Sequence, residues 1–268
     1  MQQVQNMYNE AINEVLDNAE RQSKFLNGNP FGYLVSAMIS GIFVSLSTML
    51  GAAVWVLNPE SPIKAFLSGA MTPLGLIMVV FAGTMLFTAN TFVITTSALK
   101  KRITWLDLVK IILMVYVGNW LGTLLLSFVF KMSGQLQGDI AQYYLSTFGA
   151  KLNLSFWQIL ARGFLCNILV CAAIWSTHRF KSFSAKFMII FFALLGFMAT
   201  GFENSIANMS QGSLAMLAPG GTQIIGIGNY LWVLLGSTLG NILAGVLVFA
   251  LPLWLFSKKT KADSEASV

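Results

Sequence analysis

Six long apolar segments, nearly free of charge, limit what this chain can fold into. They cover residues 31–57, 64–99, 106–130, 156–177, 186–217 and 229–256. Each is near or above the roughly 20 residues that a helix needs to cross the hydrocarbon core of a bilayer. Only 10% of the residues are charged, whereas a soluble domain carries about a quarter. We therefore expect an all-α membrane protein with six transmembrane helices.

The composition disfavours several classes of function. A net charge of +6, diluted by apolar sequence, predicts no nucleic-acid partner. Two cysteines, Cys166 and Cys171, cannot build a disulfide framework. The sequence has no cluster of His, Cys and carboxylate residues, no phosphate-binding glycine loop and no nucleophile next to a base. We expect no metal, no cofactor and no enzymatic activity.

The polar ends of the chain predict separate segments. Residues 1–28 lack the short apolar core and cleavage site of a signal peptide. Their apolar residues recur at helical spacing, at Val4, Met7, Tyr8, Ala11, Ile12, Val15 and Ala19. We expect a cytoplasmic amphipathic helix over 1–28, lying on the membrane or on a partner subunit. A six-helix transmembrane domain then covers 29–257, and a cytoplasmic polar tail covers 258–268.

The distribution of positive charge predicts the orientation. With six spans, one side of the membrane holds Arg21, Lys24, Lys100, Lys101, Arg102, Lys110, Arg179, Lys181, Lys186, Lys258, Lys259 and Lys261. The other side holds Lys64, Lys131, Lys151 and Arg162. Because basic residues stay on the cytoplasmic side, this bias predicts that both termini lie in the cytoplasm. We expect a multi-pass protein of the cytoplasmic membrane.

The two halves of the chain resemble each other. Gly118-Asn119 in the third apolar segment recurs as Gly240-Asn241 in the sixth, and Leu86-Phe87-Thr88-Ala89-Asn90 sits at nearly the same offset as Phe202-Glu203-Asn204-Ser205. Halves of three spans must be inverted relative to each other, and such repeats place a central site where paired helices are broken. We expect inverted three-helix repeats with breaks in the second and fifth helices.

The segment Gly201-Phe202-Glu203-Asn204-Ser205-Ile206-Ala207-Asn208-Met209 is the most informative. Glu203 is the one acidic residue well inside an apolar segment. A carboxylate at that depth needs backbone N–H donors from a broken helix, a proton or a wet cavity. We expect Glu203 to cap a half-helix and also to line a passage. The alternative is a structural or receptor protein without transport.

This segment resembles the formate–nitrite transporter family, whose fifth helix carries Gly-(aromatic)-Glu-His-Ser-Ile-Ala-Asn-Met. Leu86-Phe87-Thr88 is similar to the loop that breaks that family's second helix. The run from Arg162 to Cys171 is similar to its Lys-containing Leu-Cys-Asn-x-x-Val-Cys segment. The resemblance covers almost the whole chain. It implies an aquaporin-like protomer of six helices, two of them broken, assembled as a homopentamer with one pore in each protomer.

The resemblance also implies roles for individual residues. The substrate pathway would contain Thr88, Asn204, Glu203, Arg162 and Asn167, with Asn167 near Arg162. Leu76 and Phe87 would form the cytoplasmic constriction, and Phe197 part of the periplasmic one, with Thr72 where the family often has a second aromatic. Two departures stand out: Asn204 replaces the family's central His, and Arg162 replaces its vestibule Lys.

The implied substrate is a small weak-acid anion, accompanied by protons. Moving a bare anion into an apolar constriction costs several kcal/mol of free energy, whereas moving the neutral acid costs little. Arg162 would concentrate the anion, and Glu203 would orient Asn204 and make the local potential negative. Because an amide cannot titrate, protonation would draw on water. Formate ranks first, since Thr88, Asn204 and Asn167 could bind both of its oxygens; nitrite and hydrosulfide stay open.

Overall fold

The computed structural model describes the backbone of residues 2–256 and the side chains of residues 8–256, and within this range the secondary structure is helical. The predicted polar tail, 258–268, lies outside the described residues. The elements are α1 (Gln2–Gly28), α2 (Pro30–Leu57), α3 (Lys64–Gly69), α4 (Pro73–Ala82), α5 (Phe87–Leu99), α6 (Trp105–Met132), α7 (Gly138–Lys151), α8 (Phe156–Arg179), α9 (Phe183–Ala199), α10 (Ser205–Leu217), α11 (Gly221–Ile224), α12 (Ile227–Ala244), the π-helix η1 (Gly245–Ala250) and α13 (Leu251–Phe256).

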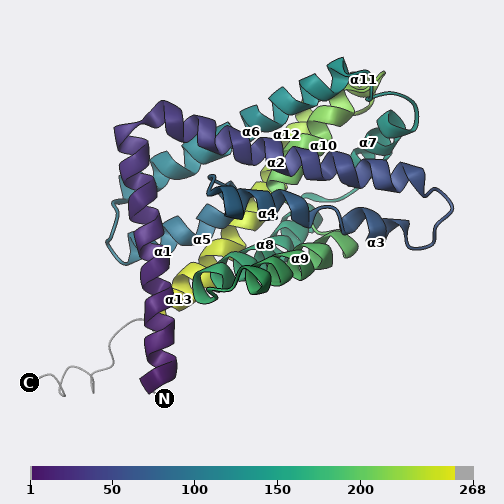
Figure 1. The fold of residues 1–268 in the computed structure, drawn as a ribbon. Helices are drawn as coiled ribbons and strands as arrows, with labels where there is room; N and C mark the ends of the chain where they lie inside the picture. The colour runs from purple at the N-terminus through teal and green to yellow at the C-terminus, as the bar shows by residue number, and fades with distance from the viewer. Residues whose placement is uncertain (1, 257–268) are drawn as a thin grey trace, which may run out of the picture.

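The helices form a bundle whose long members run side by side (Figure 1). Five helical stretches in the described chain, one of them made of α3 and α4 together, are long and apolar enough to cross a membrane: Pro30–Leu57, Lys64–Ala82, Trp105–Met132, Phe156–Arg179 and Ile227–Phe256. The shorter apolar helix α9 and the following α10 make up the fifth apolar segment. The structure therefore confirms an all-α membrane protein in which the second and fifth segments are broken.

Each break follows a glycine in the left-handed conformation. Gly83, with φ +67°, ends α4, and the chain then runs without helix to Phe87. Gly201, with φ +68°, follows α9, and α10 begins at Ser205. Side chains larger than hydrogen are rarely tolerated at positive φ, so these glycines let both helices stop inside the bundle.

Two asparagines hold the broken ends in matching ways. Asn119 of α6 accepts from the backbone N–H of Phe87 at 2.9 Å and donates to the carbonyl oxygen of Met85 at 2.9 Å. Asn241 of α12 accepts from the backbone N–H of Ser205 at 2.9 Å and donates to the carbonyl oxygen of Glu203 at 3.1 Å.

Each clamp also reaches the first long helix of its own half. Asn119 donates to the carbonyl oxygen of Ala37 in α2, and Asn241 donates to that of Gly163 in α8, both at 2.8 Å. The partners therefore correspond between the halves, and this agreement supports the internal repeat that the sequence predicts.

Glycines allow these clamping helices to approach closely. A Cβ added at Gly41 of α2 would lie 2.1 Å from the carbonyl oxygen of Asn119, and one at Gly240 of α12 would lie 2.2 Å from that of Leu160. Contacts this short exclude any side chain, so α2 packs directly on α6, and α8 on α12.

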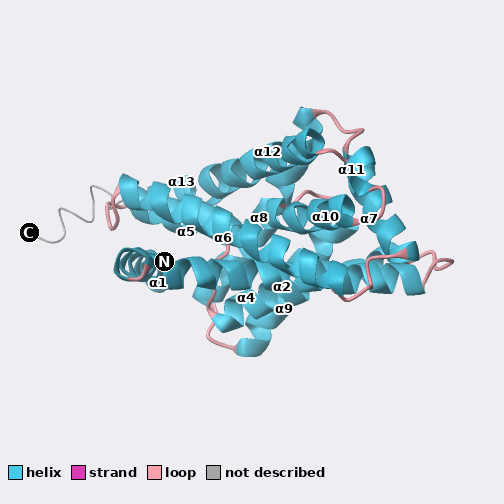
Figure 2. Cartoon of the chain, turned by 90° about the horizontal axis from the view of Figure 1, so that it is seen from above, coloured by secondary structure: helices cyan, strands magenta, loops and turns pink. Residues whose placement is uncertain are grey.

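The N-terminal helix α1 crosses one end of the bundle, and α7 and α11 lie at the opposite end (Figures 1 and 2). The apolar face of α1, including Ile12, Val15 and Ala19, is buried against the same chain. Gln22 and Asn90 of α5 exchange a reciprocal pair of hydrogen bonds at 2.8 and 3.0 Å. The expectation that α1 rests on the membrane or a partner subunit is therefore wrong for this apolar face.

The helix α7 was not predicted from the sequence. It occupies the polar stretch between the third and fourth apolar segments, with Ala141, Tyr144 and Phe148 buried. The helix α7 packs on α10 and on α2, and it ends with Lys151 close to the second break.

Candidate functional site

Three cavities follow one another through the bundle. The outer cavity, on the α7 side, has a volume of about 250 Å³. The central cavity, of about 30 Å³, shares Phe197, Asn204 and Ala207 with the outer one. The inner cavity, on the α1 side, measures about 270 Å³ and shares Leu86 with the central one. The two helix breaks therefore lie along one line of cavities.

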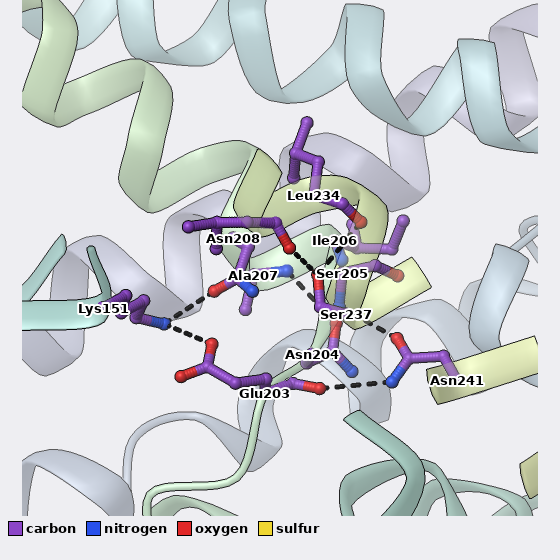
Figure 3. Close-up of polar contacts among 11 residues, drawn as sticks. Lys151, Glu203, Asn204, Ser205, Ile206, Ala207, Asn208, Leu234, Ser237 and Asn241 are labelled. Atoms are coloured by element: carbon purple, nitrogen blue, oxygen red, sulfur yellow. Dashed lines mark hydrogen bonds and ion pairs between the residues drawn. The ribbon is translucent and has the colours of Figure 1, made fainter. Parts of the chain in front are cut away.

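A buried ion pair stands at the wall of the outer cavity. Lys151 Nζ donates to Glu203 Oε2 at 2.7 Å and to Asn208 Oδ1 at 2.6 Å (Figure 3). The side chain of Lys151 is 16% exposed, and Glu203 as a residue is 3% exposed. Because little water reaches the pair, the two charges interact strongly and depend on each other.

Asn204 forms the start of α10. Its Oδ1 accepts from the backbone N–H groups of Ile206 at 3.0 Å and Ala207 at 3.1 Å (Figure 3). This capping leaves the amide NH₂ group as the part of the side chain that can bind a ligand.

The expected role of Glu203 is therefore corrected. The half-helix is capped by Asn204 and not by Glu203, and the backbone rather than Glu203 orients the Asn204 amide. The prediction of a locally negative potential is also wrong, because Lys151 compensates the carboxylate.

Arg162 lines the outer cavity, as expected, but its side chain is exposed. Its carbonyl oxygen accepts from the backbone N–H of Glu203 at 3.3 Å, which ties α8 to the second break. The cation that contacts Glu203 is Lys151, which the sequence pattern marks only as one of the basic residues on that side of the membrane.

The central cavity brings together several predicted residues. Its lining includes Thr72, Leu76, Thr88, Phe197 and Asn204. Thr88 is fully buried, and its hydroxyl has no hydrogen-bond partner among the described residues. A volume of about 30 Å³ is room for one or two water molecules, since one probe-sized water needs roughly 10–15 Å³.

Phe87 and Asn167 lie outside these three cavities. The ring of Phe87 packs edge-on against Tyr116, with centroids 4.9 Å apart. The Asn167 amide donates to the carbonyl oxygen of Asn241 at 2.7 Å and to Thr91 Oγ1 at 3.0 Å. Both side chains therefore contact neighbouring helices. Leu86, rather than Phe87, lies between the central and the inner cavity.

The inner cavity lies partly under α1. Glu14, Asn18 and Gln22 of α1 line it together with His178 of α8 and Lys186 of α9. None of these residues was predicted from the sequence to belong to a site. Within the described residues, no group of three or more His, Cys, Asp or Glu side chains is placed to hold a metal ion.

Comparison with known proteins gives consistent matches in sequence. The family described as "Formate/nitrite transporter" matches residues 9–255. The nitrite transporter NirC of Salmonella typhimurium is 31% identical over 98% of this chain and 97% of its own. The formate channel FocA of Haemophilus influenzae is 30% identical over 73% of this chain and 71% of its own.

Solved structures match as well. One described as an "FNT family ion channel" superposes with a TM-score of 0.84 at 31% identity, covering 93% of this chain and all of the other. A "pentameric formate channel with formate bound" superposes with a TM-score of 0.74 at 28% identity, covering 85% of this chain and 98% of the other. The chain therefore belongs to the formate/nitrite transporter family, whose members are multi-pass membrane transporters and channels rather than enzymes.

Proposed function

We propose that the chain moves a small monovalent weak-acid anion across the membrane, with a proton or as the neutral acid. The observation that carries this proposal is the contrast between the cavities. The residues that line the central cavity are all uncharged, whereas Lys151, Arg162 and Glu203 line the outer cavity. A path with charges at its entrance and none at its centre suits a substrate that arrives charged and crosses neutral.

Lys151 is the proposed capture group for the anion. Its Nζ already binds two oxygen atoms, so an incoming anion would share a cation that is fixed in place. Charge-assisted hydrogen bonds of this kind are about twice as strong as neutral ones. Arg162, exposed at the same cavity, would add to the positive potential at the entrance.

Phe197 is the proposed outer constriction. It is 2% exposed and separates the outer from the central cavity together with Asn204 and Ala207. When the anion loses water there, the pKa of its conjugate acid rises, which favours protonation of the anion by water of the outer cavity. In the central cavity, the Thr88 hydroxyl and the Asn204 amide would donate hydrogen bonds to the substrate.

The inner constriction is proposed to consist of Leu76 and Leu86, with Leu86 in place of Phe87. Both leucines line the central cavity, and Leu86 also lines the inner one. Thr72, at the start of α4, adds a second hydroxyl to the central cavity where an aromatic ring would narrow it. We expect this change to make the central cavity wetter.

The assembly and orientation are proposed from the same relatives and from the charge bias. A related structure is described as a pentameric formate channel, which supports a homopentamer of aquaporin-like protomers. The positive-inside bias supports a cytoplasmic α1 covering 1–28, a transmembrane domain over 29–257 and a cytoplasmic tail over 258–268. The outer cavity would then face away from the cytoplasm.

Nitrite is the first candidate substrate, and formate is the second. The preference for formate depended partly on Asn167, which binds other helices instead of lining a cavity. The relative matched over 98% of this chain carries the name of a nitrite transporter. Both anions are bent and planar, so the two donors of Thr88 and Asn204 fit either of them. Hydrosulfide, which has one heavy atom, would use only one donor.

The test is uptake by proteoliposomes that contain the purified protein. Nitrite, formate, hydrosulfide and glycerol are compared side by side, each with and without an imposed proton gradient. We expect uptake of nitrite and formate to rise when protons are supplied on the side of entry, and glycerol to stay excluded. Anion uptake that ignores the proton gradient would contradict the mechanism, and a protein without any uptake would have a structural or receptor role.

Asn204→His tests the centre of the pathway. Imidazole titrates near neutral pH and an amide does not. We therefore expect the variant to show a new dependence of nitrite uptake on pH between about 5.5 and 7.5. An unchanged pH profile would show that Asn204 is not part of the pathway. The control is Asn208→His, which alters an amide beside the ion pair rather than one in the central cavity.

A further inference from the structure

The inner cavity contains the chain's one histidine. His178 lies in the last turn of α8 and lines the cavity, with its side chain 14% exposed. The cavity adjoins the uncharged central cavity at Leu86. A substrate that leaves the central cavity on this side therefore meets an imidazole before it meets bulk water.

Charged groups approach His178 from two other helices. On α1, Glu14 Oε2 lies 4.0 Å from His178 Nδ1, and Arg21 adds a positive charge. On α9, Lys186 adds another positive charge and lines the same cavity. The polar residue that α5 contributes to this cavity, Asn90, is uncharged.

Two further cations near the end of α8 have other partners. The guanidinium of Arg179 lies over the ring of Tyr8, 4.6 Å from its centroid. Lys181 pairs with Glu10 at 3.6 Å. His178 is therefore placed between one carboxylate, from Glu14, and the positive charges of Arg21 and Lys186.

We propose that His178 exchanges a proton with the transported acid in the inner cavity. This inference rests on the proposed function. The O–H bond of the neutral acid breaks, its proton bonds to a ring nitrogen of His178, and the bonding electron pair stays on the acid oxygen. In the opposite direction the imidazolium returns the proton to an arriving anion.

The surrounding charges suit both products of this step. Glu14 balances the imidazolium, and Lys186 attracts the anion that has just formed. The proton and the anion are thereby held by different side chains, which hinders their recombination while the anion leaves. Imidazole is suited to this exchange because a ring nitrogen can bind a proton and release it again.

The experiment measures the exchange of labelled nitrite and formate in proteoliposomes with equal pH on both sides, from pH 3.5 to pH 8. Wild-type exchange, corrected for empty liposomes, is expected to change steeply over one part of this range. His178→Gln is expected to lose that step. Thr177→Val, which alters a neighbouring residue of the same cavity, serves as the matched control and is expected to keep it.

Two neighbours provide a readout that a purely structural role for His178 would not produce. Glu14→Gln removes a negative charge and is expected to move the step to lower pH by about half a unit. Lys186→Gln removes a positive charge and is expected to move it to higher pH by a similar amount, about half a unit. The side chain of Glu14 is 48% exposed, so its replacement should fold even where His178→Gln does not.

The outcomes separate the two proposals. If the wild type exchanges neither anion, the proposed function fails and this inference fails with it. If the wild type exchanges them but His178→Gln keeps the step, the inference is overturned and transport stands. Shifts of the same sign for Glu14→Gln and Lys186→Gln, or no shift, would also overturn it. Loss of the step in His178→Gln together with opposite shifts would support it.

Discussion

Replacing Lys151 with glutamine is expected to destabilise the protein by about 3–4 kcal/mol at pH 7. The reason is the environment of Glu203, which is 3% exposed and has Lys151 Nζ 2.7 Å from its Oε2. Removing one partner of a buried ion pair costs about 3–5 kcal/mol, because the other charge is left buried without a partner.

The assay is the midpoint of thermal unfolding of the detergent-solubilised protein at pH 7. Nitrite uptake at low concentration is measured as well, and it should fall because the capture group is gone.

Two further variants make this test specific. Lys131→Gln removes a lysine that is exposed at the end of α6, and it should change neither stability nor uptake. Lys151→Gln combined with Glu203→Gln removes both charges and should recover most of the lost stability, since no unpaired carboxylate remains. An unchanged unfolding midpoint in Lys151→Gln, or a double variant as unstable as the single one, would refute the reasoning.

Three other predictions concern the packing of the bundle. Asn241→Ala leaves buried backbone groups at the second break without partners, at about 1–3 kcal/mol each, and should lower the unfolding midpoint. Gly245→Ala should destabilise by about 1–3 kcal/mol, because its Cβ would lie 2.1 Å from a threonine hydroxyl of α5, whereas Gly228→Ala, with open space around it, should not. The Arg102 guanidinium lowers the pKa of Glu20. The ion pair should therefore stabilise the packing of α1 fully at pH values above the ordinary glutamate pKa, and this stabilisation should be lost as the pH falls through the lowered pKa. Hydrogen exchange of α1 measures this pH dependence, which should be absent in Arg102→Gln.

The fold was largely predictable because its signals are local. The length of the apolar segments predicts the spans, and the glycine and asparagine patterns mark the breaks and the internal repeat. Asn119 and Asn241 are the clearest case, since the sequence match between them corresponds to matching sets of hydrogen bonds. What the pattern did not predict is that these two residues hold the breaks rather than lining the pathway.

Lys151 was missed for a physical reason that the chain itself shows. It belongs to α7, and it reaches Glu203 only because that helix folds back over α10. Ala141, Tyr144 and Phe148 recur at helical spacing and are buried, so the polar stretch did carry the signal of an amphipathic helix. Its few apolar residues were outweighed by the polar residues around them, and the lysine was counted only as a charge on one side of the membrane.

The errors at the pathway follow from helix geometry and from hydrogen-bond satisfaction. Phe87 and Thr88 are neighbours on α5, and the side chains of successive helical residues point about 100° apart. Because Thr88 lines the central cavity, Phe87 points elsewhere and packs against Tyr116. The amide NH₂ group of Asn167 donates to other helices, whereas the hydroxyl of Thr88 has no partner in the described part of the chain. The Oδ1 of Asn167 also has no partner there, but Thr88 lines the central cavity and Asn167 does not. A buried donor without a partner is costly unless something fills the site. This difference, invisible in the sequence, separates a polar residue that braces the bundle from one that is available to a substrate.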